Sequence, residues 1–125
     1  MRVVDSSAWV EWLLASPTGH EVRTMLPTRD QWVVPVIVQF EIASWAYRVL
    51  DEKRAEEIIA FSEKRIVAPL NSSLAVTAAM LRKEYKLATF DAIVYATAMA
   101  YEADILTCDT HFGALPRIKL IAKRV

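Results

Sequence analysis

Four acidic residues of this sequence stand at the ends of apolar runs or near predicted helix starts: Asp5, Glu41, Asp91 and Asp109. A carboxylate in so apolar a setting costs free energy unless its charge is compensated. The usual compensation for several carboxylates together is a bound cation, and oxygen-only ligands favour Mg²⁺ or Mn²⁺. The pattern therefore indicates metal-dependent phosphate chemistry, with these four acids as candidate metal ligands and catalytic residues.

Phosphodiester hydrolysis is the reaction that such a set suits best. A divalent metal lowers the pKa of its bound water towards neutrality, and a pair of metals can clamp the attacking and leaving oxygens. No histidine base is then required, which fits a chain whose only histidines, His20 and His111, have no obvious partner. Thr107 lies two residues before Asp109 and can hydrogen-bond a carboxylate or a metal-bound water. An ordinary strand position is the alternative for Thr107.

Composition limits the class of protein. The chain has 125 residues, 54% of them hydrophobic, and only two glycines, which predicts a single globular domain spanning residues 1–125. Its net charge is zero, so any nucleic-acid binding must use a local patch. The single cysteine, Cys108, excludes an intrachain disulfide and a cysteine-based zinc site. No signal peptide or membrane-spanning run is recognisable, so we expect a cytoplasmic protein without a membrane partner.

The apolar pattern predicts short strands separated by helices. Strands are expected at residues 2–5, 32–34, 66–68 and 105–107, with a possible fifth at 119–121. Helices are expected at residues 6–14, 18–26, 38–50, 51–64, 71–86 and 89–101, with Ser6 or Ser7 capping the first and Thr89 the last. Continuous apolar runs imply strands buried on both faces, as in a parallel sheet. The prediction is a three-layer α/β domain with a parallel sheet of four to five strands flanked by helices.

This fold would bring the four acids together. In open parallel sheets, ligands bind beyond the carboxyl ends of the strands. Asp5 and Asp109 directly follow strands, and Glu41 lies on the helix after the second strand. Asp91 lies in the first turn of a helix, where the helix dipole favours a negative charge. Without a cation these acids would repel one another, which would raise their pKa values.

Four segments of the sequence resemble the motifs of a known family. They are Val4-Asp5-Ser6-Ser7-Ala8, the helix position of Glu41, the run 87–98 around Asp91, and Leu106-Thr107-Cys108-Asp109-Thr110-His111-Phe112. Together they cover essentially the whole chain, and the chain resembles a PIN-domain ribonuclease of the VapC toxin type.

The resemblance implies several properties that the residues alone do not give. It implies a PIN-like parallel sheet flanked by helices, Mg²⁺ or Mn²⁺ dependence, and endonucleolytic cleavage of single-stranded RNA. It also implies a small VapB-like antitoxin and a homodimer of the toxin. All four family acids are present, at Asp5, Glu41, Asp91 and Asp109, so we expect an active enzyme. A non-catalytic RNA-binding or partner-binding module on the same fold is the alternative.

Trp9 and Trp12 lie in a predicted helix whose apolar surface is interrupted only by Glu11. A helix that is apolar all round must be covered, either by the core of its own domain or by another chain. Core packing is the first interpretation. An antitoxin groove or a dimer face is the second.

Basic residues gather weakly in two places. We interpret most of them as a solvated surface, and some of them as candidates for guiding RNA phosphates. They are Arg82, Lys83 and Lys86 at the end of one helix, and Arg117, Lys119, Lys123 and Arg124 near the C-terminus.

Two other acidic-pocket enzymes do not fit the sequence. A phosphatase of the haloacid-dehalogenase type needs two aspartates flanking one residue after the first strand, and the segment here is Asp5-Ser6-Ser7. A two-component receiver needs a phospho-accepting aspartate after the third strand, which here ends in Pro69-Leu70-Asn71.

Overall fold

A five-stranded parallel sheet forms the centre of the protein, which we describe from a computed structural model covering residues 1–124. The strands are short and apolar, as expected for strands buried on both faces. They are β1 (Arg2–Val4), β2 (Trp32–Pro35), β3 (Ile66–Ala68), β4 (Asp104–Thr107) and β5 (Ile118–Leu120).

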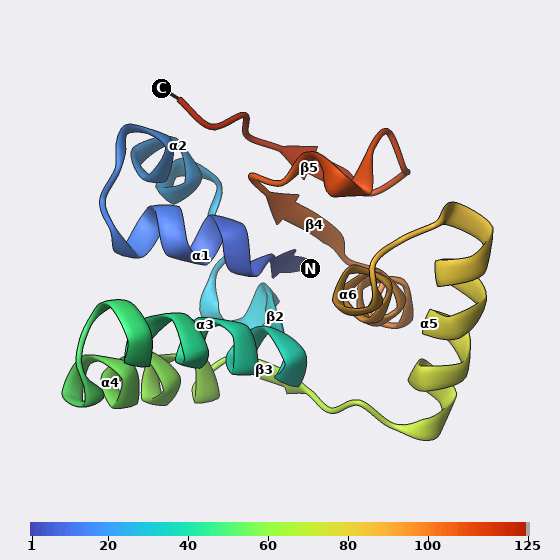
Figure 1. Ribbon diagram of the computed structural model, residues 1–125, viewed down its shortest axis with the longest axis horizontal. Helices are drawn as coiled ribbons and strands as arrows, with labels where there is room; N and C mark the ends of the chain where they lie inside the picture. The colour runs from blue at the N-terminus through green and yellow to red at the C-terminus, as the bar shows by residue number, and fades with distance from the viewer. Residues whose placement is uncertain (125) are drawn as a thin grey trace.

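Six α-helices flank the sheet and pack in consecutive pairs. Figure 1 shows α1 and α2 on the left, α3 and α4 below them, and α5 and α6 on the right, with α6 the nearer of the last pair to the strands. Two short 3-10 helices, η1 (Arg29–Gln31) and η2 (Thr110–Phe112), lie in the connections. The α-helices are α1 (Ser6–Leu13), α2 (Pro17–Met25), α3 (Val36–Val49), α4 (Glu52–Glu63), α5 (Ser72–Tyr85) and α6 (Thr89–Ala100).

The strand order β3-β2-β1-β4-β5 explains where a ligand site must lie. The chain builds the sheet outwards from β1 in one direction through β2 and β3, and then returns to the other side of β1 with β4. The carboxyl ends of β1 and β4 are therefore neighbours at the point where the order reverses, which is the usual ligand position in such sheets. The amide of Asp5 donates to the carbonyl of Leu106 (2.9 Å), which fixes the end of β1 against β4.

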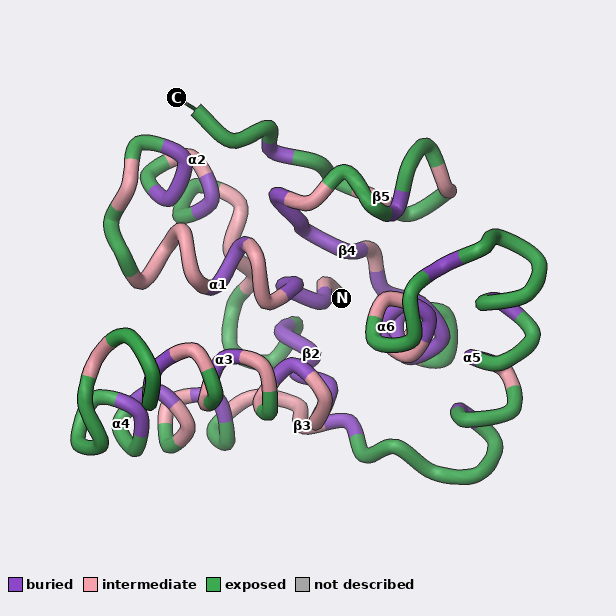
Figure 2. Tube along the Cα trace, in the orientation of Figure 1, coloured by how far each residue is buried: buried purple, intermediate pink, exposed green. Residues whose placement is uncertain are grey.

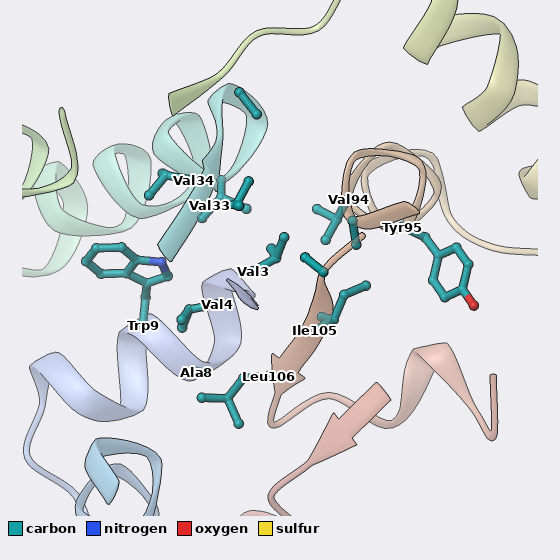
Figure 3. Close-up of a cluster of buried hydrophobic side chains, with 14 of the residues drawn as sticks. Val3, Val4, Ala8, Trp9, Val33, Val34, Val94, Tyr95, Ile105 and Leu106 are labelled. Carbon is teal, nitrogen blue, oxygen red and sulfur yellow. The ribbon is translucent and has the colours of Figure 1, made fainter. Parts of the chain in front are cut away.

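The core lies along both faces of the central strands. Figure 2 shows buried residues concentrated on the strands and on α6, whereas α5 is mostly exposed. Figure 3 shows Val3, Val4, Ile105 and Leu106 of the central strands between Trp9 on one side and Val94 and Tyr95 on the other. The side chain of Trp9 is 0% exposed and belongs to this core.

The predicted α/β class, the parallel sheet and each predicted element are confirmed, with ends shifted by one or two residues. Two predicted caps are wrong. Asp5 occupies the N-cap position of α1 without a side-chain cap bond, so neither Ser6 nor Ser7 caps that helix. Thr89 lies inside α6, which begins after Ala88, also without a side-chain cap bond. No helix among residues 1–124 is long and apolar enough to cross a membrane.

Candidate active site at the carboxyl edge of the sheet

Asp5 is the buried centre of the candidate site. It directly follows β1 and is 3% exposed. Thr107 Oγ1 and Ser7 Oγ both donate to Oδ2 of Asp5, at 2.8 and 2.9 Å. Burial raises the pKa of Asp5, and the hydrogen bonds from Thr107 and Ser7 oppose that rise by stabilising the charged form. Among residues 1–124, both side-chain hydroxyls bind the same oxygen, so the second oxygen of Asp5 receives no side-chain donor.

The same two hydroxyls tie β1 to the loop after β4. The amide of Cys108 donates to Ser7 Oγ (3.0 Å), and the amide of Asp109 donates to Thr107 Oγ1 (3.0 Å). The two hydroxyl oxygens lie 3.1 Å apart. Thr107 therefore contacts a carboxylate, as one of the two sequence interpretations held, and this network fixes Asp109 relative to Asp5.

Glu41 and Asp91 reach the site from the first turns of α3 and α6. Burial raises the pKa of Glu41 to about 7, and the negative charges of Asp5, Asp91 and Asp109 add to the effect. Burial likewise raises the pKa of Asp91 to about 6, followed by repulsion from Asp5 and Asp109. Each carboxylate thus responds to the charge of the others, which requires them to lie near one another. The predicted repulsion among the four acids is confirmed.

His111 is the one cationic group associated with the acids among residues 1–124. Its Nδ1 lies 3.1 Å from Oδ2 of Asp109, and its amide donates to Oδ1 of the same carboxylate (2.9 Å). Protonated His111 also lowers the pKa of Asp91, against the larger effect of burial. The expectation that His111 has no partner is therefore wrong. The imidazole is largely exposed, so its attraction for the acids is screened by solvent.

The donor chemistry of this edge fits a hard divalent cation. Its ligating groups are carboxylate and hydroxyl oxygens, which suit Mg²⁺ or Mn²⁺. Uncompensated charge is also present, because the pKa values of Glu41 and Asp91 are both raised. Among residues 1–124, however, no three acidic, histidine or cysteine side chains are close enough to form a ready-made cation cage. The acids surround Asp5 in a more open arrangement than a closed metal site.

Three residues of the site were missed or underrated from the sequence. Ser7 supports Asp5, Ser6 hydrogen-bonds Glu41 and lowers its pKa, and His111 pairs with Asp109. Both serines lie in the segment Asp5-Ser6-Ser7, and they were interpreted as helix caps. A hydroxyl next to a buried acid is a signal for carboxylate support as well as for capping, and that signal was present in the sequence.

The fold and the site define a parallel α/β domain with an acidic carboxyl edge. The chain belongs to the PIN domain family, whose model matches residues 2–118. Proteins of this family are in general nucleases, and nucleases are hydrolases. The identification made from the sequence motifs is therefore confirmed at the level of the family. No curated protein matches the sequence significantly.

Solved structures with the same fold include chains from toxin–antitoxin systems. One is from a toxin–antitoxin complex of Klebsiella pneumoniae, with a TM-score of 0.84, 20% identity, and coverage of 99% of this chain and 100% of that chain. Another is VapC20 of Mycobacterium tuberculosis, a toxin that cleaves the sarcin–ricin loop, with a TM-score of 0.73, 16% identity, and coverage of 97% and 99%. A third is from DNA-bound VapBC of Salmonella typhimurium, with a TM-score of 0.72, 14% identity, and 95% coverage of both chains. At these identities the likeness concerns the fold.

Proposed function

We propose that this protein is a metal-dependent endoribonuclease that cleaves single-stranded RNA, and that it is the toxin of a toxin–antitoxin pair. The observation that carries the proposal is the buried Asp5, with Glu41 and Asp91 close enough to raise one another's pKa values. Membership of a family of nucleases supports it. We take residues 1–125 to be one PIN domain acting in the cytoplasm.

The residues divide into ligands and supports. Asp5, Glu41, Asp91 and Asp109 are the proposed catalytic acids, and they would hold one or two Mg²⁺ or Mn²⁺ ions. When bound, the metal supplies an activated water and stabilises the charge on the scissile phosphate. Thr107 and Ser7 orient Asp5 through Oδ2, which leaves its other oxygen for ligation. Holding that carboxylate in one position lowers the cost of assembling the site.

A mixed pool of single-stranded RNA tests the proposal directly. We expect cleavage in the presence of Mg²⁺ or Mn²⁺, none after chelation, and recovery when metal is added back. A preparation of the Asp5→Asn variant controls for contaminating nuclease. RNA binding without cleavage by the folded wild-type protein, in any divalent metal, would instead support the non-catalytic module.

The VapB-like antitoxin would bind near Trp12. Trp9 is fully buried, so it cannot offer a surface, and the interface expected from the sequence is restricted to its partly buried neighbour. Trp12 lines a hollow of about 170 Å³ between α1 and α4, together with Leu13, Arg54 and Phe61. An apolar helix of the partner lying in such a groove is a common mode of recognition. Structural neighbours that come from VapBC complexes support this arrangement.

Charge reversal at the rim of the hollow tests the antitoxin surface. Arg54→Glu should weaken inhibition by the antitoxin encoded beside the toxin while leaving RNA cleavage unchanged. Lys53→Glu is the matched control, because Lys53 is exposed on the same helix but does not line the hollow. Equal inhibition of both variants and the wild type would rule out this surface. We further expect the antitoxin to place a basic side chain against the four acids, where negative charge is least compensated.

The homodimer remains a proposal, carried by the family resemblance. Light scattering of the free toxin, compared with the mass of one chain, measures it.

A further inference from the structure

Two exposed phenylalanine rings lie beside the acids. Phe40 on α3 is 58% exposed, and Phe90 in the first turn of α6 is 38% exposed. Their ring centroids are 6.0 Å apart at an interplanar angle of 87°. Each ring immediately precedes an acid of the site, Glu41 or Asp91. Single exposed apolar residues are ordinary, but two rings that meet across two helices beside a candidate catalytic site call for an explanation.

The edge-to-face geometry of this pair leaves room for a third aromatic group. In such a contact one ring presents its edge to the other, so the faces of the first ring stay open. Both rings remain substantially exposed, so a flat apolar group can cover them without displacing the core. An unpaired nucleobase has this shape, and every base offers a π-face for stacking.

Positive charge lies on the same side of the molecule. Arg82, Lys83 and Lys86 line a hollow of about 420 Å³ at the turn between α5 and α6. Arg82 also lines a second hollow of about 220 Å³ with Thr89, the residue directly before Phe90. Figure 1 shows this turn leading from the end of α5 into the start of α6. A chain with no net charge thus has a local basic flank next to the rings.

We propose that Phe40 and Phe90 form a stacking platform for one unpaired base of the RNA, and that Arg82, Lys83 and Lys86 contact the backbone phosphates on the adjoining stretch of strand. This inference rests on the ribonuclease activity proposed above and adds the path of the substrate. The four acids alone would repel a polyanion. Stacking and the basic flank supply the attraction that holds the strand, and the stacked base positions a neighbouring phosphate over the acids.

Substitution of the rings tests the platform. Phe40→Leu and Phe90→Leu keep an apolar side chain but lose the π-face, and each should raise KM for a short single-stranded RNA by about 5-fold or more, with a smaller effect on kcat. Phe90→Tyr retains the ring and should keep KM near the wild-type value. Tyr47→Leu is the matched control. Tyr47 is 55% exposed and lies seven residues after Phe40 on the same face of α3, about 10 Å further from the acids.

Salt dependence tests the basic flank. Lys83→Ala and Lys86→Ala should weaken RNA binding at low salt and make log K less steep against log salt, by about 0.7 for each phosphate contact to a single strand. Lys53→Ala on α4, at the opposite side of the molecule in Figure 1, should leave the slope unchanged.

The outcomes separate the two proposals. A wild-type protein that neither binds nor cleaves RNA overturns the proposed function and the platform together. Unchanged KM in both leucine variants of an active enzyme overturns the platform alone. The platform is also overturned if Phe40→Leu and Tyr47→Leu both convert a dimer into monomers in light scattering, because this face of α3 would then be covered by a second copy of the chain.

Discussion

At the amino edge of the sheet, Asp104 is paired with Arg2, whose Nε and Nη2 lie 2.7 and 2.9 Å from its two carboxylate oxygens. The same guanidinium also donates to the carbonyl of Met25 (2.7 Å), and the hydrogen bond to Asp104 raises the pKa of Arg2. At the carboxyl edge, Asp5 is more deeply buried, yet its partners are two hydroxyls and three other acids. One edge compensates its carboxylate with a fixed cation.

The other edge does not, and the difference assigns a role to each. A bidentate arginine completes the charge balance of Asp104, so that edge needs no ligand for its stability. Glu41 and Asp91 have raised pKa values because they are partly buried among other acids without such a group. Folding alone would favour an arginine there as well. The deficit is therefore informative about function, since perturbed acids cluster at sites that bind or react.

The largest effect is expected from exchanging one carboxylate for an amide at the carboxyl edge. Asp5→Asn should lower RNA cleavage by about 100-fold or more, the scale expected when a preorganised charged group is lost. Its fold should persist, because the amide oxygen can still accept from Thr107 and Ser7, and because one source of repulsion is removed. Initial cleavage rates and circular dichroism measure the two properties. Loss of the folded spectrum together with activity would mean that Asp5 has a structural role.

The supporting hydroxyls should matter less than the acids. Thr107→Val keeps the shape of the side chain but removes the hydrogen bond to Asp5, and we expect activity to fall about 10-fold or more, as for other groups that orient metal ligands. Thr97→Val is the matched control, because Thr97 is also a buried threonine and donates only to the carbonyl of Ile93 in the same helix. If both variants lose activity equally, the effect is one of packing.

The acids were predictable from the sequence, whereas their supports were largely not. Asp5 and Asp109 end strands, and the apolar runs that predict those strands also predict which edge the acids share. Ser7 and His111 act through contacts with Thr107 and Asp109 that span the chain or a tight turn, and such contacts depend on strand order. Local sequence does not encode that order.

Tertiary packing also separated the two tryptophans. Trp9 and Trp12 lie three residues apart on α1, and their composition gives no reason to separate them. Trp9 packs against Trp32 at a centroid distance of 5.0 Å and is fully buried, while Trp12 keeps part of its surface at the edge of the aromatic cluster. Helical periodicity predicts which residues share a face of a helix. It does not predict how far the neighbouring helix extends over that face.

The amino edge should show the opposite response to the carboxyl edge. Asp104→Asn should lower the free energy of unfolding by about 1.5 kcal/mol, because it weakens a charge-assisted, partly buried pair with Arg2. RNA cleavage by the folded protein should not change. Urea unfolding and cleavage rates test the two halves of the prediction. A loss of activity as large as that of Asp5→Asn would mean that the edges are not functionally distinct.

The smallest effect is a dependence of stability on pH that a divalent cation should reverse. Glu41 has an ordinary pKa of 4.5 and a folded value of about 7, and Asp91 has 3.8 and about 6. The folded protein therefore binds more protons than the unfolded chain between about pH 4 and pH 7, so the metal-free protein should lose stability as pH rises through that window. Solvent screening of these half-buried groups limits the loss to about 1 kcal/mol.

Magnesium should act in the opposite direction, because it binds the ionised carboxylates. Its stabilisation of the folded state should be slight at pH 4.5 and grow towards pH 7.5, as measured by urea unfolding with Mg²⁺ or with chelator. Glu41→Gln should flatten the metal-free pH profile, whereas Glu57→Gln, an exposed acid on α4, should leave it unchanged. Stability that rises with pH in the metal-free protein would show that the acids are already compensated at this edge. The contrast between the two edges would then be one of exposure rather than of charge.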